Sequence, residues 1–231
     1  VITAGVTAAV TLITSLEGKA EEADQFFAFG SGGVKGIYFP IVASICRTIN
    51  KRTVTHGYRC GVVATSGSKE NLREVGFGTF TFGIAQSNVV IEASRNAETP
   101  TIATLASLHP EPVHVVVRAD SGISRIADLD GAAINVGDQW SGTRDIATSL
   151  LSAAGIRPNT GQLHEYGPST QARRLCEKEV DALVWVSGIR NSSMTEVHRR
   201  CDVRLLNIPR ELAEALSASI PGLIPIDIPA G

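Results

Sequence analysis

Short apolar runs alternate with amphipathic stretches along most of the chain. The runs are bounded by Gly, Pro, Ser or Asp, which is typical of strands. They predict strands over residues 26–30, 60–65, 80–86, 101–109, 113–119, 134–137, 161–167, 180–186 and 202–208. The stretches between them place apolar residues at helical spacing. They predict helices over residues 37–52, 68–75, 87–96, 141–155, 169–179, 189–200 and 210–218, with a short helix inside 121–131.

This alternation of strand and helix predicts an α/β fold with parallel sheets and helices on both faces. Pro110 and Pro112 interrupt it between two strands, because proline cannot donate to a strand ladder. The pattern therefore falls into two sets. We expect two lobes, residues 26–117 and 118–222, each a mainly parallel sheet flanked by helices, with hinge strands and a cleft between them.

The first residues form an apolar run that turns polar at Glu17. The run is short for a membrane span and fits the core of a signal peptide, and Gly18 and Ala20 give a small-x-small cleavage pattern. We expect residues 1–20 to be a partial signal peptide, with the chain beginning inside the leader because no charged segment precedes the run. A buried strand or helix is the alternative.

Composition narrows the class of protein. The chain is 43% hydrophobic and 19% charged with a formal net charge of -2, as in ordinary globular proteins. No basic stripe accompanies this balance, and aromatic residues are only 5%, so we expect no nucleic-acid partner.

The four cysteines form no C-x-x-C motif and have no histidine at zinc spacing, so we expect no metal. Sequential pairing of Cys46 with Cys60 and of Cys176 with Cys201 would tie each helix to the strand after it. Each closed loop would stabilise the fold by about 3 kcal/mol. We favour two disulfides and an oxidising compartment. Four free, buried thiols are the alternative.

Glycine and serine recur in the turns between a predicted strand and the helix that follows it. Ser31 and Gly32 follow the first strand, Ser66, Gly67 and Ser68 follow the second, and Ser141, Gly142 and Thr143 open a later helix. In open α/β sheets, ligands bind beyond the carboxyl ends of strands, where unpaired N–H groups of helix starts favour anions. Each turn alone is typical of a helix cap. Together they predict a cradle for a small carboxylate.

Other residues near these turns are weaker candidates. Gln86 and Ser87 end the third strand and either reach the cleft or cap the next helix. Tyr38, one turn into the first helix, either closes over a ligand or packs. Arg144 is a candidate partner for a carboxylate, and Trp185 is expected to be partly core, with the alternative that its edge lines the cleft.

Catalysis is less well supported. The glycine-rich turn "GSGGVKG" lacks the Walker and dinucleotide-binding spacings, and no G-x-S-x-G occurs. Ser31, Ser68 or Ser141 could serve as a nucleophile, but no general base stands beside them in the sequence. We expect no enzyme activity and no cofactor. An extracytoplasmic sensor is a further alternative.

An ordered set of segments resembles the TAXI-type solute-binding proteins of TRAP transporters, in the periplasmic-binding-protein superfamily. The resemblance spans residues 26–231 and rests on "FGSGGVKGIYFPIVASICRTIN", "CGVVATSGSKENLREV", "FGIAQS", "ASLHPEPVHVVVRADSGISRIADLDG" and "INVGDQWSGTRDIATSLLSAAG". The segments "LCEKEVDALVWVSG" and "RCDVRLL" also fit, with their cysteines.

The resemblance implies a two-lobed, type II periplasmic-binding-protein fold, exported to the periplasm. It implies a monomer that closes on a small organic anion or amino acid, glutamate-like or dicarboxylate, and delivers it to TRAP membrane subunits without chemistry. It also implies that residues 223–231 begin a return to lobe 1 and that the chain stops before the closing segments. Trp140 departs from the usual approach to "SGT", and we expect it to narrow the pocket or stack on the ligand. The implied ligand-binding set is Ser31, Gly32, Tyr38, Ser66, Gly67, Ser68, Gln86, Ser87, Trp140, Ser141, Gly142 and Thr143.

Overall fold

A computed structural model describes residues 25–95, 102–157, 162–189 and 191–228. The N-terminal part builds a three-stranded sheet in the order β2-β1-β3, with β1 parallel to both neighbours. Its strands are β1 (Gln25–Gly30), β2 (Tyr58–Val63) and β3 (Phe82–Gly83). Its helices are α1 (Tyr38–Asn50), α2 (Thr53–His56), α3 (Ser68–Gly76) and α4 (Ser87–Arg95).

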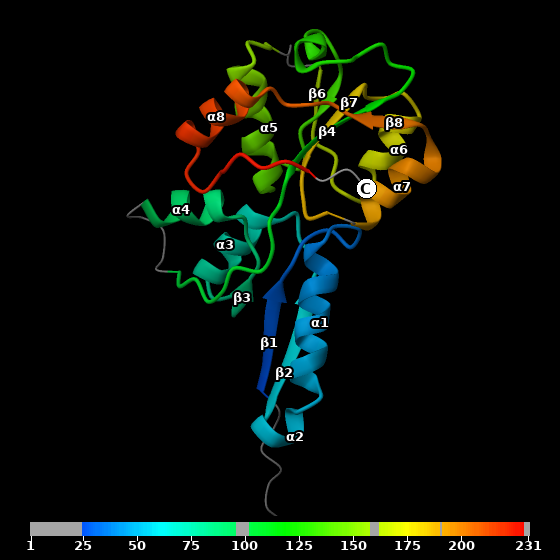
Figure 1. The fold of residues 1–231 in the computed structure, drawn as a ribbon. Helices are drawn as coiled ribbons and strands as arrows, with labels where there is room; N and C mark the ends of the chain where they lie inside the picture. The colour runs from blue at the N-terminus through cyan, green and yellow to red at the C-terminus, as the bar shows by residue number, and fades with distance from the viewer. Residues whose placement is uncertain (1–24, 96–101, 158–161, 190, 229–231) are drawn as a thin grey trace, which may run out of the picture.

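The rest of the described chain builds a five-stranded sheet in the order β6-β5-β7-β4-β8, which occupies the upper half of Figure 1. Its strands are β4 (Val113–Arg118), β5 (Ile134–Asn135), β6 (Leu163–His164), β7 (Ala182–Val186) and β8 (Val203–Leu205). Its helices are α5 (Gly142–Ala153), α6 (Gln171–Cys176), α7 (Ser192–Arg200) and α8 (Arg210–Ser219), with a 3-10 turn, η1 (Ile126–Leu129).

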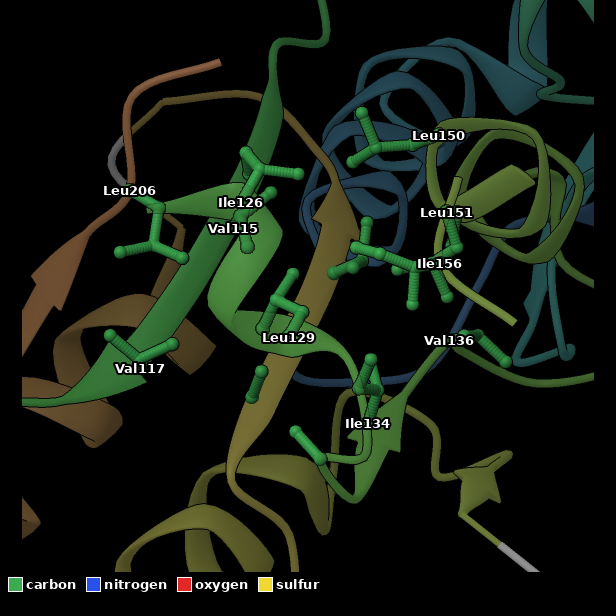
Figure 2. Packing of buried hydrophobic residues seen from close by; sticks show 14 of the residues in the cluster. Val115, Val117, Ile126, Leu129, Ile134, Val136, Leu150, Leu151, Ile156 and Leu206 are labelled. Atoms are coloured by element: carbon green, nitrogen blue, oxygen red, sulfur yellow. The ribbon is translucent and has the colours of Figure 1, made fainter. Parts of the chain in front are cut away.

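Alternation along β4 and β7 gives this sheet two apolar faces. Val115 and Val117 of β4 lie in one cluster with residues of α5 and α8, and Figure 2 shows Leu150 and Leu151 of α5 gathered there. Val116 belongs to a second cluster with residues of α6 and α7. Both faces are therefore covered by helices, as the sequence predicts, and most of the apolar core lies here.

A smaller core joins α1 to the three-stranded sheet. It contains Val42 and the disulfide-bonded pair Cys46 and Cys60. The second disulfide joins Cys176, at the end of α6, to Cys201, just before β8. Both predicted pairings are confirmed, and the alternative of four free thiols is wrong.

The α/β fold class is confirmed, but two predictions about strands are wrong. Residues 102–112 are irregular where a strand over 101–109 was predicted, and form the long connection into β4. In addition, β4 runs antiparallel to both β7 and β8, so the larger sheet is mixed. β4 is the first strand of this sheet and is reached from the other sheet, so no βαβ crossover within the sheet ties its direction to that of its neighbours.

The predicted division into lobes, residues 26–117 and 118–222, stays a prediction. All pairings of β4 lie in the five-stranded sheet. After α8 the chain comes back to α4, where Ser87 Oγ donates a 3.3 Å hydrogen bond to the carbonyl of Gly222. The predicted signal peptide lies outside the described residues. Within the part of the chain that the structure describes, no helix is long and apolar enough to cross a membrane.

Candidate functional site

A pocket lies between the two sheets, beyond the ends of their strands. From the smaller sheet it is lined by the turns after β1 and β2 and by Gln86, and from the larger sheet by the segments after β5, β6 and β7. Its cavity volume is about 70 Å³. One water molecule needs only ~10–15 Å³, so the space suits a small solute.

The start of α3 forms one wall of this pocket. Gly67 precedes the helix with φ of 127° and ψ of -149°, which only glycine adopts without strain. A Cβ on Gly67 would lie 3.4 Å from Cα of Ser141, so the two turns approach closely across the pocket. Ser68 accepts a 3.0 Å hydrogen bond at Oγ from the backbone N–H of Gln86. The N–H groups of the first helical turn thus border the cavity.

The start of α5 forms the facing wall. Ser141 caps the helix by accepting a hydrogen bond from the N–H of Arg144, and its hydroxyl donates to the carbonyl of Asp138 at 2.7 Å. Gly142 leaves no room for a side chain, since a Cβ there would meet Gln86 Oε1 at 2.1 Å. Gln86 is buried, and its Oε1 has no hydrogen-bond partner among the described residues. Two helix starts and one unpaired acceptor therefore converge on the pocket.

Tyr38 and Glu111 form a buried pair in the lining. The Tyr38 hydroxyl donates a 2.6 Å hydrogen bond to Glu111 Oε2. Burial, together with the charge of Glu111, raises the pKa of Tyr38 well above its usual value, so the phenol keeps its proton. Burial also raises the pKa of the Glu111 carboxyl, against the opposing effects of the Tyr38 hydrogen bond and of His109.

The structure brings most of the predicted site residues to this pocket. Those that line it are Gly32, Tyr38, Ser66, Gly67, Ser68, Gln86, Ser141, Gly142 and Thr143.

Three others lie elsewhere. Ser31 is fully buried, and its hydroxyl donates to the carbonyl of Val63 at 2.6 Å. Ser87 faces Gly222, and Trp140 is 40% exposed, with the Arg73 guanidinium 4.7 Å from its ring centroid. Trp140 therefore neither narrows the pocket nor faces its interior.

The lining also contains residues that the sequence did not single out. Glu111 comes from the irregular segment before β4, and Asp138 precedes the start of α5. Tyr166, Pro168 and Gln171 come from the segment around the start of α6. The only signal for Glu111 was its place between two prolines, which hold a short segment in one conformation.

The basic residues close to the pocket are engaged in ion pairs. Lys69 pairs with Asp145 at 2.6 Å, Lys35 with Glu196 at 2.6 Å, and Arg144 with Glu165 at 2.6 Å. Neither lysine nor arginine is found among the described residues of the lining. The sequence offered Arg144 as a partner for the carboxylate of a ligand. In the structure, Arg144 instead pairs with the carboxylate of Glu165.

The described residues also contain no cluster of three or more His, Cys, Asp or Glu side chains that could hold a metal ion.

The NMT1-like family model matches residues 29–231, which is most of the chain. The chain belongs to the NMT1-like family.

Solved structures similar to this one include several solute-binding proteins. The periplasmic aliphatic sulphonate binding protein SsuA from Escherichia coli has a TM-score of 0.52 at 19% identity, over 79% of this chain and 56% of that one. A binding protein of an ABC phosphonate transporter from Pseudomonas aeruginosa has a TM-score of 0.58 at 12% identity, over 80% and 65%. The substrate-binding protein of an amino acid ABC transporter has 0.55 at 17% identity, over 81% and 80%.

The chain therefore has the fold of periplasmic solute-binding proteins. It spans less than two thirds of the length of the sulphonate-binding and phosphonate-binding structures. The identities are low enough that the similarity concerns the fold alone.

Proposed function

We propose that this chain is an extracytoplasmic receptor that captures a small organic solute between its two lobes. The observation that carries the proposal is the approach of two helix starts across one pocket, with Gly67 of one wall against Ser141 of the other. The proposed ligand-binding residues are the nine predicted ones that line this pocket. The hydroxyls of Ser68 and Ser141 are engaged with backbone groups, since Ser68 Oγ accepts from the N–H of Gln86 and Ser141 Oγ donates to the carbonyl of Asp138, and this supports binding without chemistry.

Capture would work by closure of the lobes. Several contacts cross from the smaller sheet and its helices to the larger one. They include the Lys69–Asp145 and Lys35–Glu196 ion pairs and the hydrogen bond from the N–H of Lys69 to the carbonyl of Trp140 at 3.1 Å. Opening the pocket would break all three. A ligand that contacts both walls would favour the closed form by its differential affinity for the two states.

The proposed ligand is a small organic anion or amino acid, either glutamate-like or a dicarboxylate. Backbone N–H groups and the positive end of the helix dipole at the starts of α3 and α5 favour a carboxylate there. Among related folds, one solved structure is an ancestral arginine-binding protein bound to arginine, with a TM-score of 0.56 at 14% identity. An amino acid is thus a ligand that this fold accepts.

The proposed partners are the membrane subunits of a TRAP transporter, with the receptor a monomer in the periplasm. The resemblance to TAXI-type proteins supports this choice, and the two disulfides are consistent with export. The named structural relatives belong to ABC systems, so the transporter class needs its own test. Uptake by proteoliposomes that contain TRAP membrane subunits, and none by those that contain ABC subunits, would support the TRAP assignment.

A thermal-shift screen tests the receptor role. The native protein is heated with amino acids, dicarboxylates, keto acids and sugars, because a ligand that binds only the folded state raises the melting temperature. We expect a hit among the carboxylates that disappears in Ser68→Trp and Ser141→Trp. Ser152→Ala, at an exposed position of α5, is the control and should keep the hit. A flat screen would overturn the proposal.

A further inference from the structure

The charges of the pocket do not match a ligand that is only an anion. The lining contains two carboxylates, Glu111 and Asp138, and its described residues include no lysine or arginine. A dicarboxylate would place two negative charges beside these groups with no cation to compensate them. Like charges close together in a poorly solvated site are strongly unfavourable.

The two carboxylates differ in their surroundings. Asp138 accepts a 2.9 Å hydrogen bond at Oδ1 from the N–H of Trp140 in the exposed turn before α5, whereas Glu111 lies with Tyr38 in the partly buried part of the lining, where a charge is solvated less. The Glu111 carboxylate accepts one hydrogen bond from the described side chains, that of Tyr38 at Oε2. A carboxylate has about four acceptor sites, so most of its capacity is unused.

Gln86, in the same lining, does not offer a comparable acceptor. It is only 7% exposed, and its Oε1 is buried against Gly142 without a partner among the described residues. Glu111 is therefore the acceptor that the pocket offers to a ligand, whereas the backbone of the two helix starts offers donors.

From this arrangement we infer that the ligand carries a protonated amino group, which Glu111 binds, together with a carboxylate at the helix starts. The inference rests on the proposed receptor function and narrows it to small amino acids. Tyr38 has a positioning role, because its hydroxyl holds one oxygen of Glu111 and leaves the other for the ammonium. Burial raises the pKa of the Glu111 carboxyl, and a bound ammonium would offset this effect by supplying the missing opposite charge.

Isothermal titration with matched pairs of solutes tests the inference. The pairs are L-glutamate with glutarate, L-alanine with propionate and L-leucine with 4-methylpentanoate, in which each acid lacks only the amino group. We expect at least one amino acid to bind about tenfold more tightly than its partner, the difference typical of one hydrogen bond to a charged group. In Glu111→Gln we expect this preference to vanish.

Tyr38→Phe is the matched variant. It removes the same Tyr38–Glu111 hydrogen bond but keeps the carboxylate, so it should retain the preference for the amine even if both members of a pair bind more weakly. Thermal unfolding of both variants checks that they fold.

Acids that bind as tightly as the amino acids, or an unchanged preference in Glu111→Gln, would overturn this inference and leave the receptor function standing. Binding by none of the six solutes nor by any other in the screen would overturn both.

Discussion

The ammonium nitrogen of Lys69 on α3 lies 2.6 Å from Asp145 Oδ1 on α5, so one ion pair joins the two walls of the pocket. Both side chains are about one third exposed, and such a pair contributes about 0.2–1 kcal/mol. If closure accompanies binding, Lys69→Glu should raise the Kd of the ligand about two- to fivefold, because it places two carboxylates together. Titration calorimetry measures this change.

The double variant Lys69→Glu with Asp145→Lys restores the pair in reverse and should recover most of the affinity. Arg210→Gln on α8 is the control, since its partner Glu214 lies on the same helix and no wall is crossed. Equal affinities in Lys69→Glu and wild type would show that the pair has no part in closure.

Gly142 allows the walls to meet. In Gly142→Ala the new Cβ would meet Gln86 Oε1 at 2.1 Å and Val89 Cγ2 at 3.0 Å, so the two walls must separate or Gln86 must turn away. We expect ligand affinity to fall about tenfold or more, which a ~1.4 kcal/mol cost of closure would produce. Ser152→Ala, at an exposed position of the same helix, should bind as wild type does. Tight binding by Gly142→Ala would mean that the walls need not approach as closely as they do here.

The two disulfides should matter for stability. They close loops with sequence separations of 14 and 25 residues, and each should contribute about 3 kcal/mol by restricting the unfolded chain. Reduction, or the double variants Cys46→Ala with Cys60→Ala and Cys176→Ala with Cys201→Ala, should lower the melting temperature by several degrees. Thermal unfolding with and without a reductant checks this. An unchanged melting temperature would show that neither bridge stabilises the protein by restricting the unfolded chain.

His114 on β4 should make stability depend on pH. It is buried, its Nδ1 lies 3.3 Å from the carbonyl oxygen of Trp185, and burial lowers its pKa below 6.5. Between that lowered pKa and 6.5 the unfolded chain binds more protons than the folded one, so stability rises with pH in this window. We therefore expect the contribution of His114 to the free energy of unfolding to be complete above pH 6.5. It should decrease as the pH falls below 6.5. Urea unfolding across this range should show the fall in wild type and a smaller one in His114→Gln. The same fall in both proteins would assign it to other groups.

The sequence predicted most of the elements and most of the residues that line the pocket, because both depend on local patterns. The near-continuous apolar run of β4 marks a strand with two buried faces, and glycine-serine turns mark helix starts at strand ends. Strand direction is not local, so the reversal of β4 against β7 could not be read from periodicity.

Local sequence patterns also could not predict which individual residues line the pocket. The side chain of Ser31 turns back to the carbonyl of Val63, and Trp140 lies beside Arg73 on a neighbouring helix. Glu111 reaches the pocket only because the irregular segment before β4 passes Tyr38. Each of these outcomes depends on contacts between segments far apart in the chain.

Amide hydrogen exchange tests most directly the claim that this pocket binds the solute. The native protein is compared with and without the ligand that raises its melting temperature most. We predict that protection increases at Ser68, Gly142 and Thr143, because the N–H groups of these first-turn residues would bind the carboxylate, whereas those of Lys69 and Arg144 already donate to Trp140 and Ser141. Protection confined to other segments, such as the groove beside Cys46 and Val62, would contradict the account.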